Sequence, residues 1–475
     1  MSKDASGEAE RPGGPQLTPA TARRLEERVG EERAAQRLPS LIVGLARDGE
    51  LDWWAGRGSA SSSGDEPPTP DTQYRIGSIS KTFTAVAAMR LRDEGALDLS
   101  DPIGAHLPEL SDLPVTVAQL LSHTSGLRAE SEGAWWERTE GVSFTELAAS
   151  SLGPGDLLCR PGRRFHYSNL GFGVLGELVA RLRGSTWPDV VQHELLDPLG
   201  MRRTTLRPAP PHAEGLAVHP HAPVVLREPE HDALAMAPAG QLWSTLEDLV
   251  TWSSVLSGRR PEVLGRKTAA EMAEPLGITD SPGQPWTMAY GLGFMLWNQA
   301  GRRRLGHAGA MPGHMALLLV DAATNVALVA ATNSTYQGFR GPFFDELLGL
   351  FEAETPAAPA PAPFPPARGE EERAAVAELV GWWYWGPVPY RLDLLADGRL
   401  ELCGAAPSGR DGTFRPAGDG TYRGESGYFT AETLVVHRAP DGTASHLDIA
   451  SFVFTRAPYA PGSVIPGGVD EAGWR

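Results

Sequence analysis

Apolar runs at the start and near the end of the chain have the character of β-strands. Residues 41–56 contain two such runs joined by Asp48-Gly49, a dipeptide typical of a two-residue β-hairpin turn. Strand-like runs return at 290–297, 303–310 and 314–334, and a turn at Asp321–Asn325 divides the last of them. The pattern predicts that the late strands follow one another in antiparallel order.

Between about 97 and 285 the pattern is mostly helical, with helices expected near 170–182 and 245–256. A further helix is expected from Thr18-Pro19 to about Gln36, because Thr is a good N-cap and Pro suits the first helical turn. The two N-terminal strands and the late strands would then form one sheet, with a helical region inserted between them. This predicts an α+β fold.

The segment 79–92 is apolar or small at nearly every position, which predicts a central helix buried on all sides. Lysine occurs in the chain only at Lys3, Lys81 and Lys267, against 42 Lys and Arg residues in total. Wherever a solvated cation is needed the chain uses arginine, so Lys81, inside the buried helix, calls for a specific explanation.

Ser78 and Lys81 lie three residues apart at the start of this helix, so both side chains leave from the same face. A serine hydroxyl is a poor nucleophile until a base takes its proton. Burial lowers the pKa of a lysine by disfavouring its charge, whereas arginine stays protonated. The alternative is an N-cap serine followed by a lysine that extends to the surface, and the S-x-x-K pattern by itself does not decide between them.

Two further short patterns contain residues that could serve the same site. Tyr167-Ser168-Asn169 precedes a predicted helix; a tyrosine beside a buried ammonium would become more acidic, and Asn169 could bind both the lysine and a substrate amide. His307-Ala308-Gly309 lies on a predicted strand, where the glycine permits close backbone approach. The alternatives are a loop tyrosine with an N-cap asparagine, and an ordinary strand histidine.

Taken together, Ser78-x-x-Lys81, Tyr167-x-Asn169 and His307-x-Gly309 resemble the three motifs of the serine β-lactamase and penicillin-binding-protein superfamily. The tyrosine of the second motif is similar to the class C β-lactamase and D-Ala-D-Ala carboxypeptidase branch, which includes esterases. The stretches QLLSHTSGL, LLDPLGMRRTTL and APAGQLWSTLEDLVTW also resemble that branch. The resemblance covers roughly residues 20–350 and implies the β-lactamase/transpeptidase-like fold.

The resemblance implies that Ser78 is the nucleophile of an acyl-enzyme mechanism and that Lys81 activates it. Tyr167 would be the proton shuttle, Asn169 would orient the substrate and Lys81, and His307 would line the site.

The backbone N–H groups of Ser78 and Ala310 would form the oxyanion hole, and Gly309 would contact the substrate. The β-lactamases carry a lysine where this chain has His307, which is mostly neutral at pH 7. Efficient hydrolysis of β-lactams is therefore not expected, and esters, thioesters and amides remain open. His123 is expected to be a structural loop histidine.

Three functions are compatible with these motifs. The first is a serine hydrolase acting on an ester, thioester or peptide-like substrate. The second is a thioesterase or acyltransferase of the penicillin-binding-protein type, which releases and cyclises a nonribosomal peptide from a peptidyl thioester. Such enzymes resemble this chain in their three motifs and a C-terminal lipocalin-like domain. The third is a sensor that is acylated and does not turn over.

Composition divides the chain into four parts. Residues 1–17 are expected to be a disordered tail, 18–354 the serine hydrolase domain and 355–372 a Pro/Ala-rich linker. In 373–475, short alternating runs separated by Asp-Gly pairs predict a small antiparallel β-barrel. These pairs are Asp397-Gly398, Asp411-Gly412, Asp419-Gly420 and Asp441-Gly442. Trp382–Trp385 are expected to fill its core or to contribute to substrate selection.

The net charge of −17 argues against nucleic-acid and anionic-membrane partners, since both require basic patches. The N-terminus has no apolar signal segment and no apolar run approaches membrane-spanning length, so a cytoplasmic location is expected. The two cysteines provide neither a disulfide framework nor a metal cluster. No zinc motif is present, His219 and His221 are expected to be solvated, and no cofactor is implied. A small-molecule or peptide substrate is the expected partner.

Overall fold

The computed structural model describes residues 5–8, 17–222, 224–299, 301–335, 341–354, 377–395, 397–405 and 409–460. Contacts divide the chain into two compact units, Met1–Thr355 and Pro356–Arg475, each described here by itself. The expected linker at 355–372 lies outside the described residues, and the four boundaries drawn from composition stay predictions.

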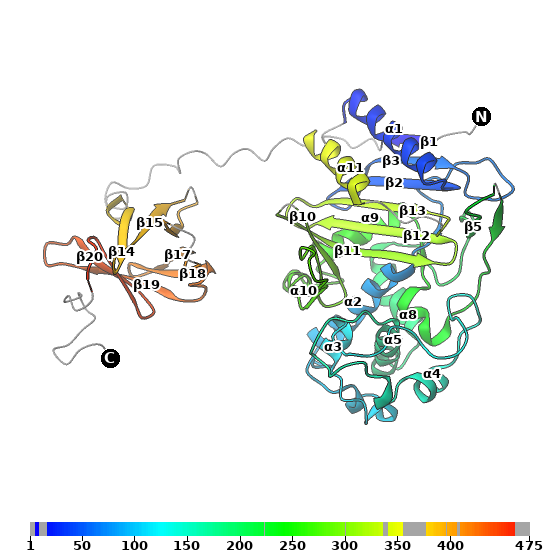
Figure 1. Ribbon diagram of the computed structural model, residues 1–475, viewed down its shortest axis with the longest axis horizontal. Helices are drawn as coiled ribbons and strands as arrows, with labels where there is room; N and C mark the ends of the chain where they lie inside the picture. The colour runs from blue at the N-terminus through cyan, green and yellow to red at the C-terminus, as the bar shows by residue number, and fades with distance from the viewer. Residues whose placement is uncertain are drawn as a thin grey trace. The chain divides into compact units, whose positions relative to one another are not determined.

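One sheet, built from N-terminal strands and from strands late in the chain, forms the framework of the first unit (Figure 1). Its strand order is β1-β3-β2-β13-β12-β11-β10-β9-β8, and neighbouring strands are antiparallel. The strands are β1 (Ala5–Glu8), β2 (Ser40–Arg47), β3 (Glu50–Gly58), β8 (Gly277–Ile278), β9 (Met288–Tyr290), β10 (Met295–Gln299), β11 (Arg302–Met311), β12 (His314–Asp321) and β13 (Val326–Thr332). The predicted joining of N-terminal and late strands is confirmed, since β13 pairs with β2.

The turn between β2 and β3 is the one that Asp48-Gly49 predicts. Asp48 and Gly49 have φ of 54° and 81°, and Arg47 pairs with Glu50 across the turn. Two positive φ angles match the right-handed twist of the flanking strands.

Helices cover both faces of the sheet (Figure 1). On one face α1 (Pro19–Ala35) and α11 (Gly341–Ala353) bury Leu25, Val29, Phe344 and Leu347 against the strands. Thr18 caps α1 as predicted, accepting the Thr21 N–H through its hydroxyl. On the other face α2 (Ser80–Asp93) and α9 (Leu246–Leu256) belong to a larger core that continues into the inserted helical region.

The inserted region consists of helices with short paired strands. The remaining α-helices are α3 (Val117–Leu121), α4 (Phe144–Ser151), α5 (Asn169–Arg183), α6 (Trp187–Val191), α7 (Asp197–Leu199), α8 (Ala237–Gly240) and α10 (Arg266–Met272). Single turns occur at η1 (Gly77–Ile79), η2 (Ile103–Ala105), η3 (Pro108–Leu110), η4 (Pro154–Asp156), η5 (Gln192–Leu196) and η6 (Leu234–Met236). Strand β4 (Tyr74–Arg75) pairs with β7 (Trp243–Ser244), and β5 (Leu216–Val218) pairs with β6 (Val225–Arg227).

Helix α2 is buried all round, as its apolar sequence predicts. Phe83 stacks on Trp252 of α9 with 3.9 Å between ring centroids, and both side chains have no exposed surface. This packing fixes the start of α2, next to which Ser78 lies.

The second unit is a closed antiparallel barrel, which confirms the predicted C-terminal β-domain. Its strands are β14 (Gly381–Trp385), β15 (Val388–Leu394), β16 (Leu400–Gly404), β17 (Gly412–Gly418), β18 (Thr421–Gly427), β19 (Thr433–Arg438), β20 (Ala444–Ile449) and β21 (Phe452–Thr455). Within the tryptophan cluster, Trp383 is buried in the barrel core whereas Trp382 is half exposed. Trp383 therefore agrees with the expected filling of the core, and a contribution of the cluster to substrate selection stays a prediction. A specific likeness to lipocalins stays a prediction.

Three expectations differ from the structure. The run 290–297 is not one strand, because β9 ends at Tyr290 and β10 begins at Met295. Part of the N-terminal segment, Ala5–Glu8, pairs with β3 as strand β1, although composition predicts disorder for all of 1–17. The pair Asp411-Gly412 is not a hairpin turn, because Gly412 already pairs in β17 and Asp411 accepts the N–H of Gly404. None of the described helices combines the length and apolar composition needed to cross a membrane.

Candidate active site

Ser78 lies in a tight turn that is pressed against strand β11. Gly77 has a φ of 52°, and a Cβ added there would lie 2.5 Å from the backbone nitrogen of Ala310. A Cβ added at Gly309 would lie 1.9 Å from the carbonyl oxygen of Ile76 and 3.0 Å from the Ser78 nitrogen. Only glycine fits at both positions. The absence of side chains there lets the two segments that carry the backbone N–H groups of Ser78 and Ala310 lie directly against each other.

The Lys81 amine is the immediate partner of the Ser78 hydroxyl. Its Nζ lies 2.8 Å from Ser78 Oγ and donates to the carbonyl oxygen of Ala239 in α8 at 2.6 Å. Lys81 has no exposed surface, and this burial lowers its pKa from 10.5 to about 7, against the opposing charges of Glu130 and Glu137. A substantial fraction of Lys81 is therefore unprotonated near neutral pH, when its lone pair can accept the Ser78 proton.

Tyr167 lies over the same amine. The Lys81 Nζ is 5.0 Å from the centroid of the Tyr167 ring. Burial raises the pKa of Tyr167 above its ordinary value, although a hydrogen bond with Ser78 opposes this. The expected acidification by a buried ammonium is therefore wrong, because desolvation of the phenolate dominates. The Tyr167 hydroxyl keeps its proton near neutral pH.

Asn169 is the first residue of α5, where Ser168 caps the helix by accepting the Gly171 N–H. Its Nδ2 donates to Glu130 Oε1 at 2.7 Å, and its buried Oδ1 has no partner among the described residues. The described hydrogen bonds of Asn169 therefore lead to Glu130, and the expected bond to Lys81 is not among them.

His307 is buried and its two ring nitrogens are both occupied. Nδ1 lies 2.5 Å from the Ala308 carbonyl oxygen, which can only accept, so Nδ1 carries the proton. Nε2 therefore accepts the hydroxyl of Tyr290, which lies 2.8 Å away. Burial, with a contribution from Lys81, lowers the pKa of His307 to about 3. His307 is thus a neutral wall of the site, in agreement with the expected absence of a cation.

His123 holds the Tyr167 segment in place, as a structural loop histidine would. Its Nδ1 accepts the Ser168 N–H at 3.0 Å, and its carbonyl oxygen accepts the His166 N–H at 2.8 Å. The ring also packs against Tyr167, with 4.2 Å between centroids. His123 has a φ of 55° and is completely buried.

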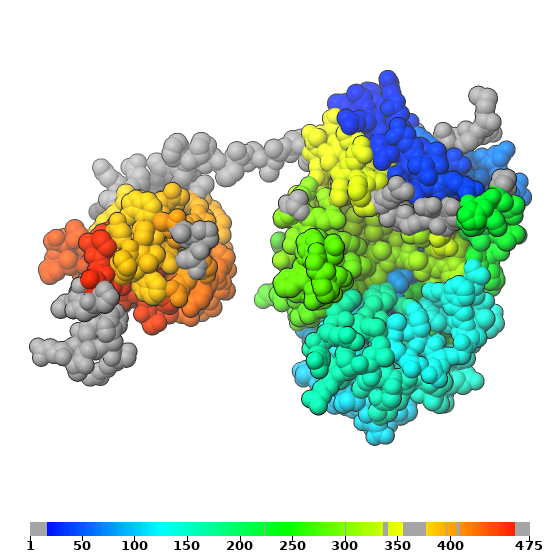
Figure 2. Space-filling view, viewed as in Figure 1, coloured from blue at the N-terminus to red at the C-terminus, as the bar shows by residue number. Residues whose placement is uncertain are grey.

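A cavity of about 590 Å³ connects the predicted residues. Ser78, Tyr167, His307, Gly309 and Ala310 all line it. Its remaining wall is largely apolar and comes from β10, β12 and α11, and includes Met295, Trp297, Met315, Leu317 and Phe344. In Figure 2 the yellow-green sheet and the cyan helical region face each other across a hollow, in which a small blue patch of the N-terminal part is visible.

Strand β11 also presents a free edge to this cavity. Strand β10 pairs with residues 302–306 of β11 only, so one edge of residues 308–310 has no strand partner among the described residues. An extended substrate could pair with this edge through backbone hydrogen bonds.

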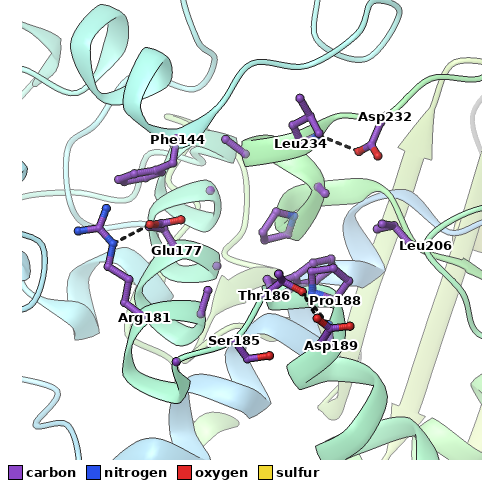
Figure 3. A pocket seen from close by; sticks show the side chains of 18 residues that line it. Phe144, Glu177, Arg181, Ser185, Thr186, Pro188, Asp189, Leu206, Asp232 and Leu234 are labelled. Atoms are coloured by element: carbon purple, nitrogen blue, oxygen red, sulfur yellow. Dashed lines mark hydrogen bonds and ion pairs between the residues drawn. The ribbon is translucent and has the colours of Figure 1, made fainter.

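A larger cavity of about 820 Å³ contains none of the predicted site residues (Figure 3). Phe144, Glu177 and Arg181 lie on one side of it, and Thr186 and Asp189 on another. Size alone therefore does not identify the site; the grouping of Ser78, Lys81 and Tyr167 does.

Four residues that contribute to the site had no role in it assigned from the sequence. Glu130 and Glu137 occur in a polar stretch that reads as a solvated loop, yet Glu137 lines the cavity with Ser78. Tyr290 and Ala239 reach His307 and Lys81 from distant parts of the chain, and only the fold brings them there.

The described residues contain one group of side chains close enough to share a metal ion, and it lies on the barrel. His437, His446 and Asp448 offer ligand atoms within 4.8 Å of one another. His437 Nε2 lies 2.7 Å from Asp448 Oδ2, and the two imidazole rings stack. The group contains none of the residues around Ser78.

Comparison with known proteins gives two family matches. A model described as Beta-lactamase matches residues 23–347, and one described as a domain of unknown function (DUF7586) matches residues 372–456. The second match lies on the barrel unit.

Individual relatives are hydrolases. Esterase EstB of Burkholderia gladioli is 28% identical over 368 residues, which cover 68% of this chain and 92% of EstB. The D-alanyl-D-alanine-carboxypeptidase/endopeptidase AmpH of Escherichia coli (strain K12) is 29% identical over 212 residues, or 43% of this chain; the chain spans 54% of AmpH.

The crystal structure of SurE superposes with a TM-score of 0.58 at 28% identity, covering 92% of this chain and 99% of SurE. Since the first family model spans more than half of the sequence, the chain belongs to the beta-lactamase family of serine hydrolases, which is related to the penicillin-binding proteins.

Proposed function

We propose that this protein hydrolyses esters, thioesters or peptide-like amides through an acyl-enzyme on Ser78. The observation that carries the proposal is the buried Lys81 amine, with a pKa of about 7, at 2.8 Å from the Ser78 hydroxyl. A neutral amine at hydrogen-bond distance is the base that a serine nucleophile requires.

In the first step Ser78 Oγ bonds to the substrate carbonyl carbon, and its proton moves to Lys81 Nζ. The oxyanion that forms is bound by the backbone N–H groups of Ser78 and Ala310. The bond to the leaving group then breaks, and Tyr167 gives the leaving group its proton and regains one from Lys81. This leaves an acyl-enzyme and a neutral amine.

In the second step water takes the place of the leaving group. Its oxygen bonds to the acyl carbon as its proton moves to Tyr167, which passes its own hydroxyl proton to Lys81 Nζ, and the ester bond to Ser78 Oγ breaks. The proton returns to Ser78, which restores the starting state.

The neutral His307 argues against substrates that depend on a fixed cation at this position. An anionic carboxylate there would find no charge partner in the imidazole, whose pKa is about 3. Uncharged esters, thioesters and amides do not need one. The relatives EstB and AmpH are named as an esterase and a carboxypeptidase/endopeptidase, which supports this range.

Hydrolysis of p-nitrophenyl esters tests the proposal. Ser78→Ala and Lys81→Ala should each abolish turnover without changing the circular dichroism spectrum. The exposed Lys267→Ala is the matched control and should be as active as the unmodified protein. Normal turnover by either site variant would refute the assignment.

A second candidate is acyl transfer in which an amine takes the place of water, as in a peptide cyclase. The barrel that follows the hydrolase unit in the chain favours it, since the penicillin-binding-protein-type thioesterases that the three motifs resemble also carry a C-terminal β-domain. A peptidyl thioester incubated with the protein should then give cyclic product by mass spectrometry, and only linear acid would argue against it. A stoichiometric adduct on Ser78 that persists would support the non-turnover sensor instead.

A further inference from the structure

Two neighbouring strands of the barrel bring three metal-binding side chains to one face. His446 and Asp448 lie two residues apart on β20, so their side chains leave the sheet on the same side. His437 on β19 is the cross-strand partner of His446 (Figure 1). The alternate residues Leu447 and Ile449 are buried in the barrel core, so the three side chains lie on its outer face.

This group contains two buried acceptor atoms that no donor reaches. His446 is only 7% exposed, and its Nε2 has no hydrogen-bond partner among the described residues. Asp448 Oδ1 is also buried without a partner there, whereas Oδ2 lies 2.7 Å from His437 Nε2. The contact between His437 and Asp448 therefore satisfies one oxygen of the carboxylate and leaves the other oxygen and the second imidazole unexplained.

Ser445 determines which nitrogen of His446 carries the proton. Its hydroxyl has a single proton and donates it to the His437 carbonyl oxygen at 3.2 Å, which can only accept. Nδ1 of His446 lies 2.9 Å from the same hydroxyl, so Nδ1 must be the donor in that contact. A neutral imidazole has one N–H, and Nε2 of His446 therefore presents a lone pair.

A lone pair on a buried imidazole beside a free carboxylate oxygen is the donor set of a metal cation. We propose that His437 Nε2, His446 Nε2 and a carboxylate oxygen of Asp448 bind a Zn²⁺ ion, with water as the fourth ligand. Two imidazoles and one carboxylate suit zinc, whereas Mg²⁺ and Ca²⁺ take oxygen ligands. Three protein ligands with an open fourth position are a common zinc arrangement.

The distances within the group fit such a site. Tetrahedral zinc bonds of about 2.0–2.2 Å hold neighbouring ligand atoms roughly 3.3–3.5 Å apart. The three ligand atoms lie within 4.8 Å of one another, and the contact between His437 and Asp448 is 2.7 Å long. These separations bracket the required spacing, so small side-chain rotations are sufficient.

The surroundings of the two histidines also fit. The bond from His446 Nδ1 to Ser445 is the outer contact that orients a metal-binding imidazole. His437 would carry its proton on Nδ1, which water can serve because this side chain is 41% exposed. The three ligands form no zinc motif in the sequence, since only the pairing of β19 with β20 brings them together.

The test uses the full untagged chain, freed of metal with a chelator and titrated with ZnCl₂ in a calorimeter. We expect one Zn²⁺ per chain with a Kd below about 10 μM. His437→Ala and Asp448→Asn each remove a ligand and should weaken binding about 100-fold or more, and Ser445→Ala should weaken it about tenfold or more. His219→Ala, which removes an exposed histidine of the first unit, is the control and should leave Kd unchanged.

Thermal unfolding separates a zinc site from a simple ion pair. Zn²⁺ should raise an unfolding midpoint of the unmodified chain increasingly with its concentration, and should not do so in His437→Ala. Binding weaker than about 10 μM, or midpoints that Zn²⁺ leaves unchanged, would reduce the group to an ion pair beside a stacked imidazole and overturn the proposal.

Equal Kd values for the unmodified chain and His437→Ala would place the zinc elsewhere and overturn the proposal as well. Circular dichroism in chelator confirms that each variant is folded before zinc is added. None of these measurements depends on Ser78, so their outcome is independent of the proposed hydrolase function.

Discussion

The protonation of Lys81 should set the pH dependence of ester hydrolysis. Burial lowers the pKa of Lys81 to about 7, and the charges of Glu130 and Glu137 oppose part of that shift. The amine accepts the Ser78 proton only in its unprotonated form, so kcat/KM should rise with pH and level off above about pH 8. Because one proton inactivates the base, we expect roughly a tenth of the plateau at pH 6 and roughly a hundredth at pH 5.

The other buried groups at the site should contribute little to this rising limb. Burial keeps the imidazoles of His307 and His123 neutral near pH 7, since the pKa of each lies well below its ordinary value. Tyr167 stays protonated because burial raises its pKa. The exception is Glu137. Burial raises its pKa as well, so deprotonation of Glu137 would also give a rate that rises with pH.

The assay is kcat/KM for p-nitrophenyl butyrate between pH 5 and 9.5, corrected for spontaneous hydrolysis, with circular dichroism recorded at each pH. Glu137→Gln separates the two origins. It removes a charge that raises the Lys81 pKa, so the limb should persist with its midpoint at lower pH. The control Glu140→Gln, at an exposed glutamate three residues further along the chain, should leave the midpoint in place. A rate that still rises without levelling off at pH 9.5, as an unshifted lysine would give, or a limb that vanishes in Glu137→Gln, would refute Lys81 as the base.

Three further substitutions test the packing around the site. In Gly309→Ala the new Cβ would lie 1.9 Å from a backbone carbonyl oxygen, so the oxyanion donors must move and ester turnover should fall about 10²- to 10³-fold; Gly349→Ala, with no atom within 4 Å, should be fully active. Tyr290→Phe leaves Nε2 of the buried His307 without its donor and should lower the free energy of unfolding in urea by about 1–3 kcal/mol. Phe83→Ala removes a buried ring stacked on a tryptophan and should cost about 3–5 kcal/mol in the same measurement.

The parts of the fold that the sequence predicts are those with a strong local pattern. The hairpin at Asp48-Gly49, the buried helix α2 and the apolar strands β12 and β13 each carry their own signal, and the structure contains all of them. Strands β1, β8 and β9 extend the sheet but have only two to four residues each. Such short strands are fixed by their pairing with distant neighbours, and no local pattern marks them.

The features of the site also fall into those that a local sequence motif marks and those that only the fold determines. Ser78, Lys81, Tyr167, Asn169 and His307 belong to spaced motifs. The structure places Ser78, Tyr167 and His307 on the wall of one cavity and Lys81 against Ser78, whereas the side-chain hydrogen bond of Asn169 leads to Glu130. Their electrostatic states were harder to predict, because desolvation depends on the whole fold. The raised pKa of Tyr167 is the case in point: proximity to an amine suggested the opposite direction, but burial outweighs it.

Lys81 is one of only three lysines in the chain, and its use as a buried base explains the role of the nearby charges of Glu130 and Glu137. A buried amine is useful as a base only while its pKa stays near the working pH, and burial alone would lower that pKa further than Glu130 and Glu137 now allow. The two carboxylates therefore keep Lys81 basic enough to accept a proton. Arginine at position 81 could not take this role, since it cannot be deprotonated. Nucleophile activation thus depends on glutamates that make no contact with the Ser78 hydroxyl among the described hydrogen bonds, so a substitution of either one should shift the pH dependence of ester hydrolysis.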